Sequence, residues 1–92
     1  MHITKEIIVN GSVQGVGFRS YVLRQAIRFG IKGEVWNAYD GTVHVIAQHL
    51  SENVINSFKE SLSSGPGKVA SLSCGESTNA PTYDSFSITS SR

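Results

Sequence analysis

The sequence predicts an α+β fold in which two helices cover one face of a mostly antiparallel sheet. Apolar and polar residues alternate in several short segments, which is typical of half-buried strands. Two longer segments instead repeat their apolar residues every three or four positions, as amphipathic helices do. An Asp-Gly pair at Asp40-Gly41 indicates a tight hairpin turn between two strand-like segments. A chain of 92 residues fits one domain, and we expect residues 1–92 to form it.

The first half of the chain predicts the order strand, helix, strand, strand. The strands are expected over residues 5–13, 32–37 and 42–48, and the helix over residues 18–29. The helix places Val22, Ala26 and Phe29 on one face, and Gly30 is a suitable cap for its end. The turn falls at Tyr39–Gly41, so the second and third strands form a hairpin.

The second half predicts a further helix and two further strands. Ser51 is a good N-cap, and Val54, Phe58 and Leu62 then recur at every fourth position. After a Ser, Gly and Pro break, Ala70, Leu72 and Cys74 alternate with serines, which predicts a strand with Cys74 at least half-buried. Residues 83–89 close the chain as an extra C-terminal strand. The order βαββαβ plus one strand favours a ferredoxin-like sandwich.

Composition excludes several functions. The net charge is +1 without a basic block, so we expect no nucleic-acid partner. The longest early apolar run is Ile7–Val9, too short for a signal peptide or membrane span. Cys74 is the only cysteine, and His44 and His49 should point to opposite faces of one strand, so no metal or cofactor is expected. These properties are consistent with a cytoplasmic monomer.

The segment Gly11–Arg19 is suited to an anion. It joins a predicted strand to a predicted helix, whose first backbone N–H groups are unpaired and carry a partial positive charge. Gly15 and Gly17 let a phosphate approach the backbone, and Arg19 adds a planar set of donors. The segment is not a P-loop, since no Gly-Lys-Ser/Thr follows, nor a dinucleotide fingerprint, since Ser20 replaces the third glycine. A plain strand–helix connection remains the alternative.

Asn37 is the second candidate. It ends a predicted strand just before the hairpin turn, where asparagine is usually a turn former. Its amide can also hold a water molecule, because it both donates and accepts hydrogen bonds.

Gly11-Ser-Val-Gln-Gly-Val-Gly-Phe-Arg19 resembles the phosphate-loop signature of the acylphosphatase family. The segment Gly33-Glu-Val-Trp-Asn37 followed by Asp40-Gly41-Thr-Val43 is similar to that family's second signature, and Phe86-Ser-Ile88 resembles its C-terminal strand. The resemblance spans essentially the whole chain. Family members usually carry an aromatic residue at the position of Glu34 and a basic residue at that of Thr89, so this chain departs from the pattern there.

The resemblance implies hydrolysis of a small-molecule acyl phosphate to a carboxylate and inorganic phosphate. Arg19 would grip the phosphoryl group together with the backbone of Gln14, Gly15, Val16, Gly17 and Phe18, and Asn37 would orient the attacking water. The chemistry needs no general acid, because the carboxylate leaving group has a conjugate-acid pKa of about 4.

Three alternatives remain at this point. A catalytically weak or inactive relative would bind an anion or a partner through the same loop. A nucleic-acid module would need exposed aromatic residues with basic neighbours, and the sheet offers chiefly Trp36, Tyr39 and Tyr83. A heavy-metal-binding domain would need a cysteine pair, which Cys74 lacks.

Overall fold

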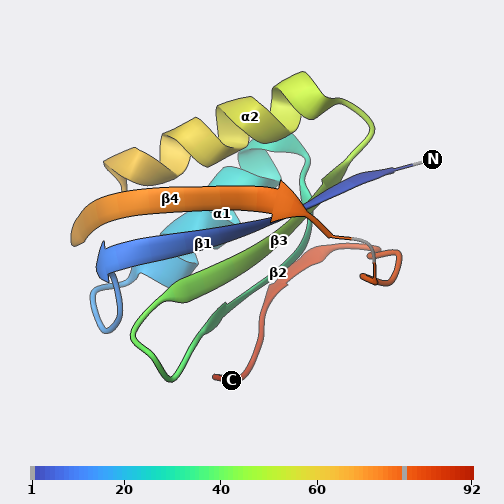
Figure 1. The fold of residues 1–92 in the computed structure, drawn as a ribbon. Helices are drawn as coiled ribbons and strands as arrows, with labels where there is room; N and C mark the ends of the chain where they lie inside the picture. The colour runs from blue at the N-terminus through green and yellow to red at the C-terminus, as the bar shows by residue number, and fades with distance from the viewer. Residues whose placement is uncertain (1, 78) are drawn as a thin grey trace.

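The structure, a computed structural model, describes residues 2–77 and 79–92 as a five-stranded sheet with both helices on one face (Figure 1). The elements run β1 (Ile3–Ser12), α1 (Phe18–Phe29), β2 (Lys32–Asn37), β3 (Val43–His49), α2 (Glu52–Ser61), a 3-10 turn (Leu62–Ser64), β4 (Lys68–Glu76) and β5 (Phe86–Ile88). The strand order is β4-β1-β3-β2-β5, with β5 parallel to β2 and every other pair antiparallel. The predicted ferredoxin-like sandwich, including its extra C-terminal strand, is confirmed.

The local signals place most elements correctly. Helix α1 and strand β2 begin and end where the sequence predicts, and Gly30 caps α1 in a left-handed conformation, with φ of 69°. The side chain of Ser51 accepts a hydrogen bond from the backbone N–H of Val54 at the start of α2. Strand β1 begins two residues earlier than expected and is irregular after Asn10, where its pairing with β4 shifts.

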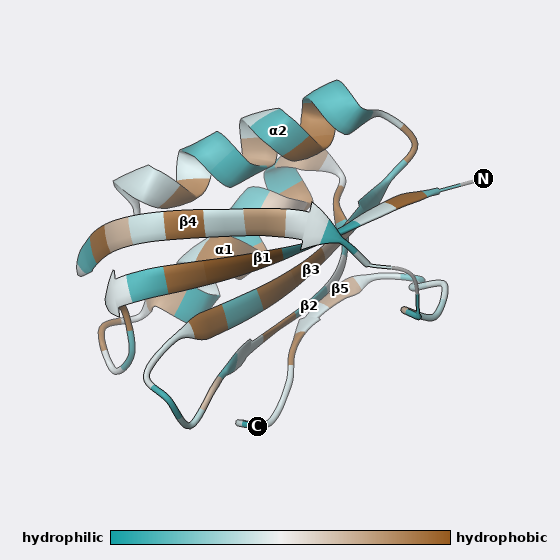
Figure 2. Ribbon diagram, in the orientation of Figure 1, coloured by the Kyte–Doolittle hydropathy of each residue, from teal (hydrophilic) through white to brown (hydrophobic). Residues whose placement is uncertain are grey.

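The core lies between the sheet and the helices. Figure 2 shows the hydrophobic residues of α2 on its side toward the sheet and hydrophilic residues on its outer side. The largest fully buried side chains come from both layers: Phe18, Phe58, Ile7, Ile55 and Leu62. Within the described part of the chain, no helix is long and apolar enough to cross a membrane.

One burial prediction is wrong. Cys74 is exposed, although its neighbours suggest a half-buried strand residue. Among the described residues, strand β4 lies at the edge of the sheet and has no strand on its outer side. Alternation of apolar and polar residues along an edge strand does not ensure that the apolar ones are covered.

Candidate active site

The segment between β1 and α1 is held rigidly at both ends. Val13 and Phe18, which flank the four loop residues, are each only 1% exposed and belong to the core. Tyr21, one turn into α1, donates a hydrogen bond from its hydroxyl to the carbonyl oxygen of Ser61 at 2.7 Å. The loop is therefore fixed by packing before any ligand arrives, which is the property an anion site needs.

The backbone of the loop has the expected shape for an anion site. Gly15 and Gly17 have φ of 74° and 85°, the left-handed region that disfavours other residues. Gly17 is also the N-cap of α1, and no side chain of the described residues caps the helix there. The first N–H groups of α1 therefore lack a side-chain acceptor in this part of the chain, and an anion could accept their hydrogen bonds.

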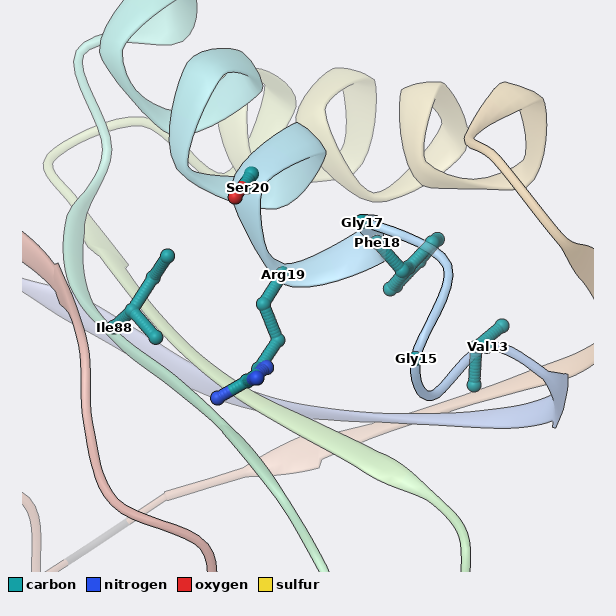
Figure 3. Close-up of a pocket in the computed structure, with 7 residues that line it drawn as sticks. All are labelled: Val13, Gly15, Gly17, Phe18, Arg19, Ser20 and Ile88. Carbon is teal, nitrogen blue, oxygen red and sulfur yellow. The ribbon is translucent and has the colours of Figure 1, made fainter.

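Arg19 projects from the first turn of α1 into a cavity (Figure 3). The cavity has a volume of about 130 Å³, well above the ~10–15 Å³ that a single water molecule needs. Its lining comprises Val13, Gly15, Gly17, Phe18, Arg19, Ser20 and Ile88. Arg19 forms no salt bridge with any carboxylate of residues 2–77 and 79–92, so its charge is available to a ligand.

Ser20 and Ile88 line this cavity, and neither is predicted from the sequence. Ser20 follows Arg19 in the same helical turn, so its position was a usable signal. Ile88 comes from β5, and its side chain stays 39% exposed although a strand neighbour, Phe86, packs against the core. The pairing of Ile88 with Val35 of β2 brings it to the cavity, a contact that only the sheet creates.

Gln14 has a different environment from the other loop residues. Its side-chain Nε2 donates hydrogen bonds to the carbonyl oxygens of Ala38 (2.7 Å) and Thr42 (2.9 Å). These two residues belong to the β2–β3 hairpin, so Gln14 ties the loop to the hairpin that carries Asn37. The side-chain amide of Gln14 is used in these two hydrogen bonds. The backbone N–H of Gln14 is therefore the group that could donate to a ligand.

Asn37 lies beside this link. It ends β2 and shares a strand face with the fully buried Val35, so it points to the side of the sheet that carries α1. Its side-chain Oδ1 is buried and has no hydrogen-bond partner among the described residues. A buried polar oxygen normally has a hydrogen-bond partner. The Oδ1 atom of Asn37 could therefore accept a hydrogen bond from a water molecule or a substrate.

The hairpin turn is fixed by its own hydrogen bonds. Asp40 accepts hydrogen bonds from the backbone N–H and the hydroxyl of Thr42, at 3.1 and 2.6 Å. Both hydrogen bonds lower the pKa of Asp40 below its usual range. The bond from the Thr42 hydroxyl has the larger effect and the bond from its backbone N–H the smaller. Asp40 is therefore a turn-stabilising carboxylate, and Asn37 sits on a rigid support.

Other predicted features lie away from this cavity. Val16 is 43% exposed and does not line it. Trp36 covers the sheet face opposite the helices, where its ring stacks on His44 at 5.4 Å, and His44 contacts Glu6. No cluster of three or more potential metal ligands occurs within residues 2–77 and 79–92.

The fold and the site define a ferredoxin-like sandwich whose first strand–helix connection, with Gly15, Gly17 and Arg19, lines a cavity at the start of α1. Residues 5–88 match the sequence profile of the Acylphosphatase family, so the chain belongs to the acylphosphatase family and is a hydrolase of that type.

Individual relatives agree with this assignment. The chain is 38% identical over 88 residues to the acylphosphatase of Actinobacillus succinogenes, covering 94% of this chain and 97% of that one. It is 49% identical over 53 residues to the acylphosphatase of Lactococcus lactis, a match that covers 58% of this chain and 55% of that relative. The crystal structure of acylphosphatase from Bacillus subtilis superposes with a TM-score of 0.87 at 38% identity, over 97% of this chain and 99% of that chain.

Proposed function

We propose that Arg19 and the backbone N–H groups of the Gln14–Arg19 loop bind the phosphoryl group of an acyl phosphate, and that Asn37 orients the attacking water. The observation that carries this proposal is the cavity at the start of α1, where Arg19 has no carboxylate partner among the described residues. The proposal extends family membership to named atoms of this chain.

The reaction requires little beyond position and charge. Water oxygen bonds to phosphorus while the bond from phosphorus to the acyl oxygen breaks, and the electron pair leaves with the carboxylate. A proton from the water passes to the phosphate product or to solvent. Charge on the phosphoryl oxygens is stabilised by Arg19 and the loop amides, and catalysis of this kind rests mainly on positioning and electrostatics.

Asn37 supplies the positioning. Its amide can accept one hydrogen bond from the water through Oδ1 and donate another through Nδ2. The buried Oδ1, which has no partner among residues 2–77 and 79–92, supports this role, since a water molecule would donate a hydrogen bond to it. The rigid hairpin then holds the water at a defined angle to the phosphorus bound near Arg19.

The experiment compares Arg19→Ala, Arg19→Lys and Asn37→Ala with the natural sequence, using benzoyl phosphate as substrate. We expect both Arg19 variants to lose about 100–1000-fold in kcat, as the loss of one strong oxyanion contact does. Asn37→Ala should lose about 100-fold, because the attacking water is no longer positioned. Arg19→Lys should fail as well, because an ammonium group cannot make a bidentate contact. Arg24→Ala, which removes an exposed arginine of the same helix, is the matched control and should keep full activity.

Retention of natural turnover by Arg19→Ala or Asn37→Ala would show that the residue roles are wrong. Binding of inorganic phosphate without any turnover of benzoyl phosphate would instead favour an anion-binding relative. Isothermal titration of the natural chain and of Arg19→Ala with inorganic phosphate separates these outcomes. An anion-binding relative binds phosphate and loses this binding in Arg19→Ala, whereas wrong residue roles leave the binding intact in that variant.

We further propose that residues 1–92 act as a single domain, as a cytoplasmic monomer. One continuous cluster of buried residues joins both helices to the sheet, which supports a single domain. Cys74 is a free and exposed thiol, which fits a reducing compartment. Sedimentation equilibrium of the purified protein tests the monomer, and a concentration-dependent mass would contradict it.

A further inference from the structure

The last residues of the chain continue along β2 beyond the end of β5. The backbone N–H of Thr89 donates to the carbonyl oxygen of Val35 at 2.9 Å. Three residues on, the N–H of Arg92 donates to the carbonyl oxygen of Asn37 at 2.9 Å, and the carbonyl oxygen of Arg92 accepts from the N–H of Tyr39 at 2.8 Å. The segment 89–92 therefore bonds to the backbone on both sides of the proposed water-orienting residue. Figure 1 shows it running beside β2 toward the hairpin.

Side chains hold this segment in place through Glu34. One carboxylate oxygen of Glu34 accepts from Arg92 Nη2 at 2.6 Å and from Thr89 Oγ1 at 3.1 Å, and the other accepts from the hydroxyl of Tyr83 at 2.5 Å. The guanidinium of Arg92 also lies over the ring of Trp36, with Cζ 4.0 Å from its centroid. We name these five residues, Glu34, Trp36, Tyr83, Thr89 and Arg92, the Glu34 clasp.

The clasp is more than an exposed ion pair. Isolated surface pairs stabilise proteins little, because water competes for both charges. The side chain of Glu34 is only 14% exposed and has three donors, and the guanidinium of Arg92 is held by a carboxylate on one side and an aromatic face on another. Arg92 itself is 50% exposed, so it contributes little to the core.

The clasp and the reaction lie on opposite faces of the sheet. Glu34 and Trp36 alternate with Val35 and Asn37 along β2, so the clasp occupies the face away from the helices. The clasp can affect the position of the Asn37 side chain because Arg92 is hydrogen-bonded to the backbone of Asn37. An amide that must hold a water at a defined angle is sensitive to small displacements, and a shift of about 1 Å can cost up to 100-fold in rate.

We propose that Glu34 and Arg92 are positioning residues for the hydrolysis, acting through the backbone of Asn37. This inference rests on the proposed function, since it needs Asn37 to orient the water. The clasp contains no residue of the β1–α1 loop, and Ile88, which precedes Thr89, lines the cavity only with an apolar side chain. We therefore expect the clasp to affect mainly kcat and to change phosphate binding little.

The test uses the whole chain and the variants Arg92→Ala, Arg92→Lys and Glu34→Gln, with benzoyl phosphate as substrate and inorganic phosphate as inhibitor. We expect Arg92→Ala and Glu34→Gln to lower kcat about tenfold, a fraction of the loss that complete misplacement causes. KM and the inhibition constant of phosphate should stay within about twofold, and Arg92→Lys should recover part of kcat because it keeps a charge for Glu34. Arg24→Ala and Glu60→Gln, two exposed helix residues, are the matched controls.

A second background distinguishes positioning from general destabilisation. In a chain that already carries Asn37→Ala, the further change Arg92→Ala should not lower kcat again. The effects of two coupled residues on kcat are not additive, and Arg92 acts only through Asn37. Thermal unfolding of each variant is the control that tests whether it is folded at the assay temperature. If Arg92→Ala does not fold, Arg92→Lys and Glu34→Gln carry the test.

Two results would overturn the inference alone: kcat within twofold of the natural chain in both Arg92→Ala and Glu34→Gln, or an equal loss from Arg92→Ala with and without the Asn37 side chain. In either case Asn37→Ala would still lose its activity. If Asn37→Ala keeps natural turnover, the proposed function is itself wrong, and the inference falls with it.

Discussion

At the scale of single residues, the candidate site is marked by groups that the protein leaves unsatisfied. Arg19 has a positive charge at a helix N-terminus, where a cation opposes the helix dipole, and no carboxylate of the described residues pairs with it. Asn37 has a buried oxygen without a partner in the same part of the chain. Each arrangement costs stability in the empty protein, and a bound phosphoryl group and water would offset both costs.

A residue-scale prediction concerns Gly33, where β2 and β3 approach closely. A Cβ at Gly33 would lie 1.8 Å from the carbonyl oxygen of Ile46, and φ there is +147°. We expect Gly33→Ala to lower the free energy of unfolding by about 2–6 kcal/mol, the sum of backbone strain and overpacking. Gly75→Ala is the control, since no atom of the described residues lies within 4 Å of its added Cβ, and it should change stability by less than about 0.5 kcal/mol. Urea unfolding measures both, and equal stabilities would contradict the prediction.

At the scale of elements, the candidate site combines two connections that are far apart in sequence, of which only the β1–α1 loop lines the cavity at Arg19. The β1–α1 loop supplies the proposed phosphate contacts and the β2–β3 hairpin supplies Asn37. Gln14 links them through Ala38 and Thr42, and the segment 89–92 holds the hairpin from its other side. The hairpin is thus fixed by two neighbours, only one of which belongs to the proposed anion-binding loop.

An element-scale prediction removes the Gln14 link. Gln14→Met keeps the length of the side chain and deletes its two donors, so we expect a loss of about 1 kcal/mol in stability and a lower kcat. Gln14→Glu should be worse in both respects, because a carboxylate would face two carbonyl oxygens and add a negative charge beside the bound phosphate. Parallel urea unfolding and benzoyl phosphate kinetics measure the two effects. A Gln14→Glu variant as active as Gln14→Met would contradict this account.

At the scale of the whole molecule, the two faces of the sheet have different roles. The face toward the helices carries the core and the proposed reacting groups, and the opposite face carries the Glu34 clasp and the stack of Trp36 on His44. Burial acts to raise the pKa of Glu34, but hydrogen bonds from Tyr83, Thr89 and Arg92, with the charge of Arg92, outweigh it and hold the pKa below its usual value of 4.5. Burial and the hydrogen bond to Glu34 in turn raise the pKa of Tyr83 to about 12.

A whole-molecule prediction follows for stability against pH. The unfolded chain binds a proton at Glu34 more readily than the folded protein does, so Glu34 stabilises the fold above its ordinary pKa. This contribution should be lost as the pH falls from about 5 toward the lower pKa of the folded state. Tyr83, whose pKa is raised to about 12, does not titrate in this range. Glu34→Gln should therefore make the thermal midpoint less dependent on pH between about 5 and 3, while Glu60→Gln should not. Asp40, whose pKa is also lowered, should supply a remaining slope in both.

The sequence predicts the elements well where their signals are local. Helix α1 has an apolar repeat, a glycine at each end and no competing turn residues, so its limits follow from short-range physics. Strand β4 is less predictable, because its cover depends on which strand becomes the edge, and Cys74 is exposed for that reason. The lining residue Ile88 was missed because only sheet pairing brings β5 beside α1.

The sequence by itself determined the class of fold, the family, and the two residues proposed to act on the substrate. Each of these depends on residue type and spacing along the chain, which the sequence states directly. Only the tertiary structure decided that Gln14 reaches the hairpin and that Glu34, Trp36 and Arg92 join into one clasp. The sequence alone marks Glu34 as a departure from the family pattern, in which an aromatic residue is usual at this position. Its partners lie 49 to 58 residues away, and contacts over such separations arise only when packing brings the strands together.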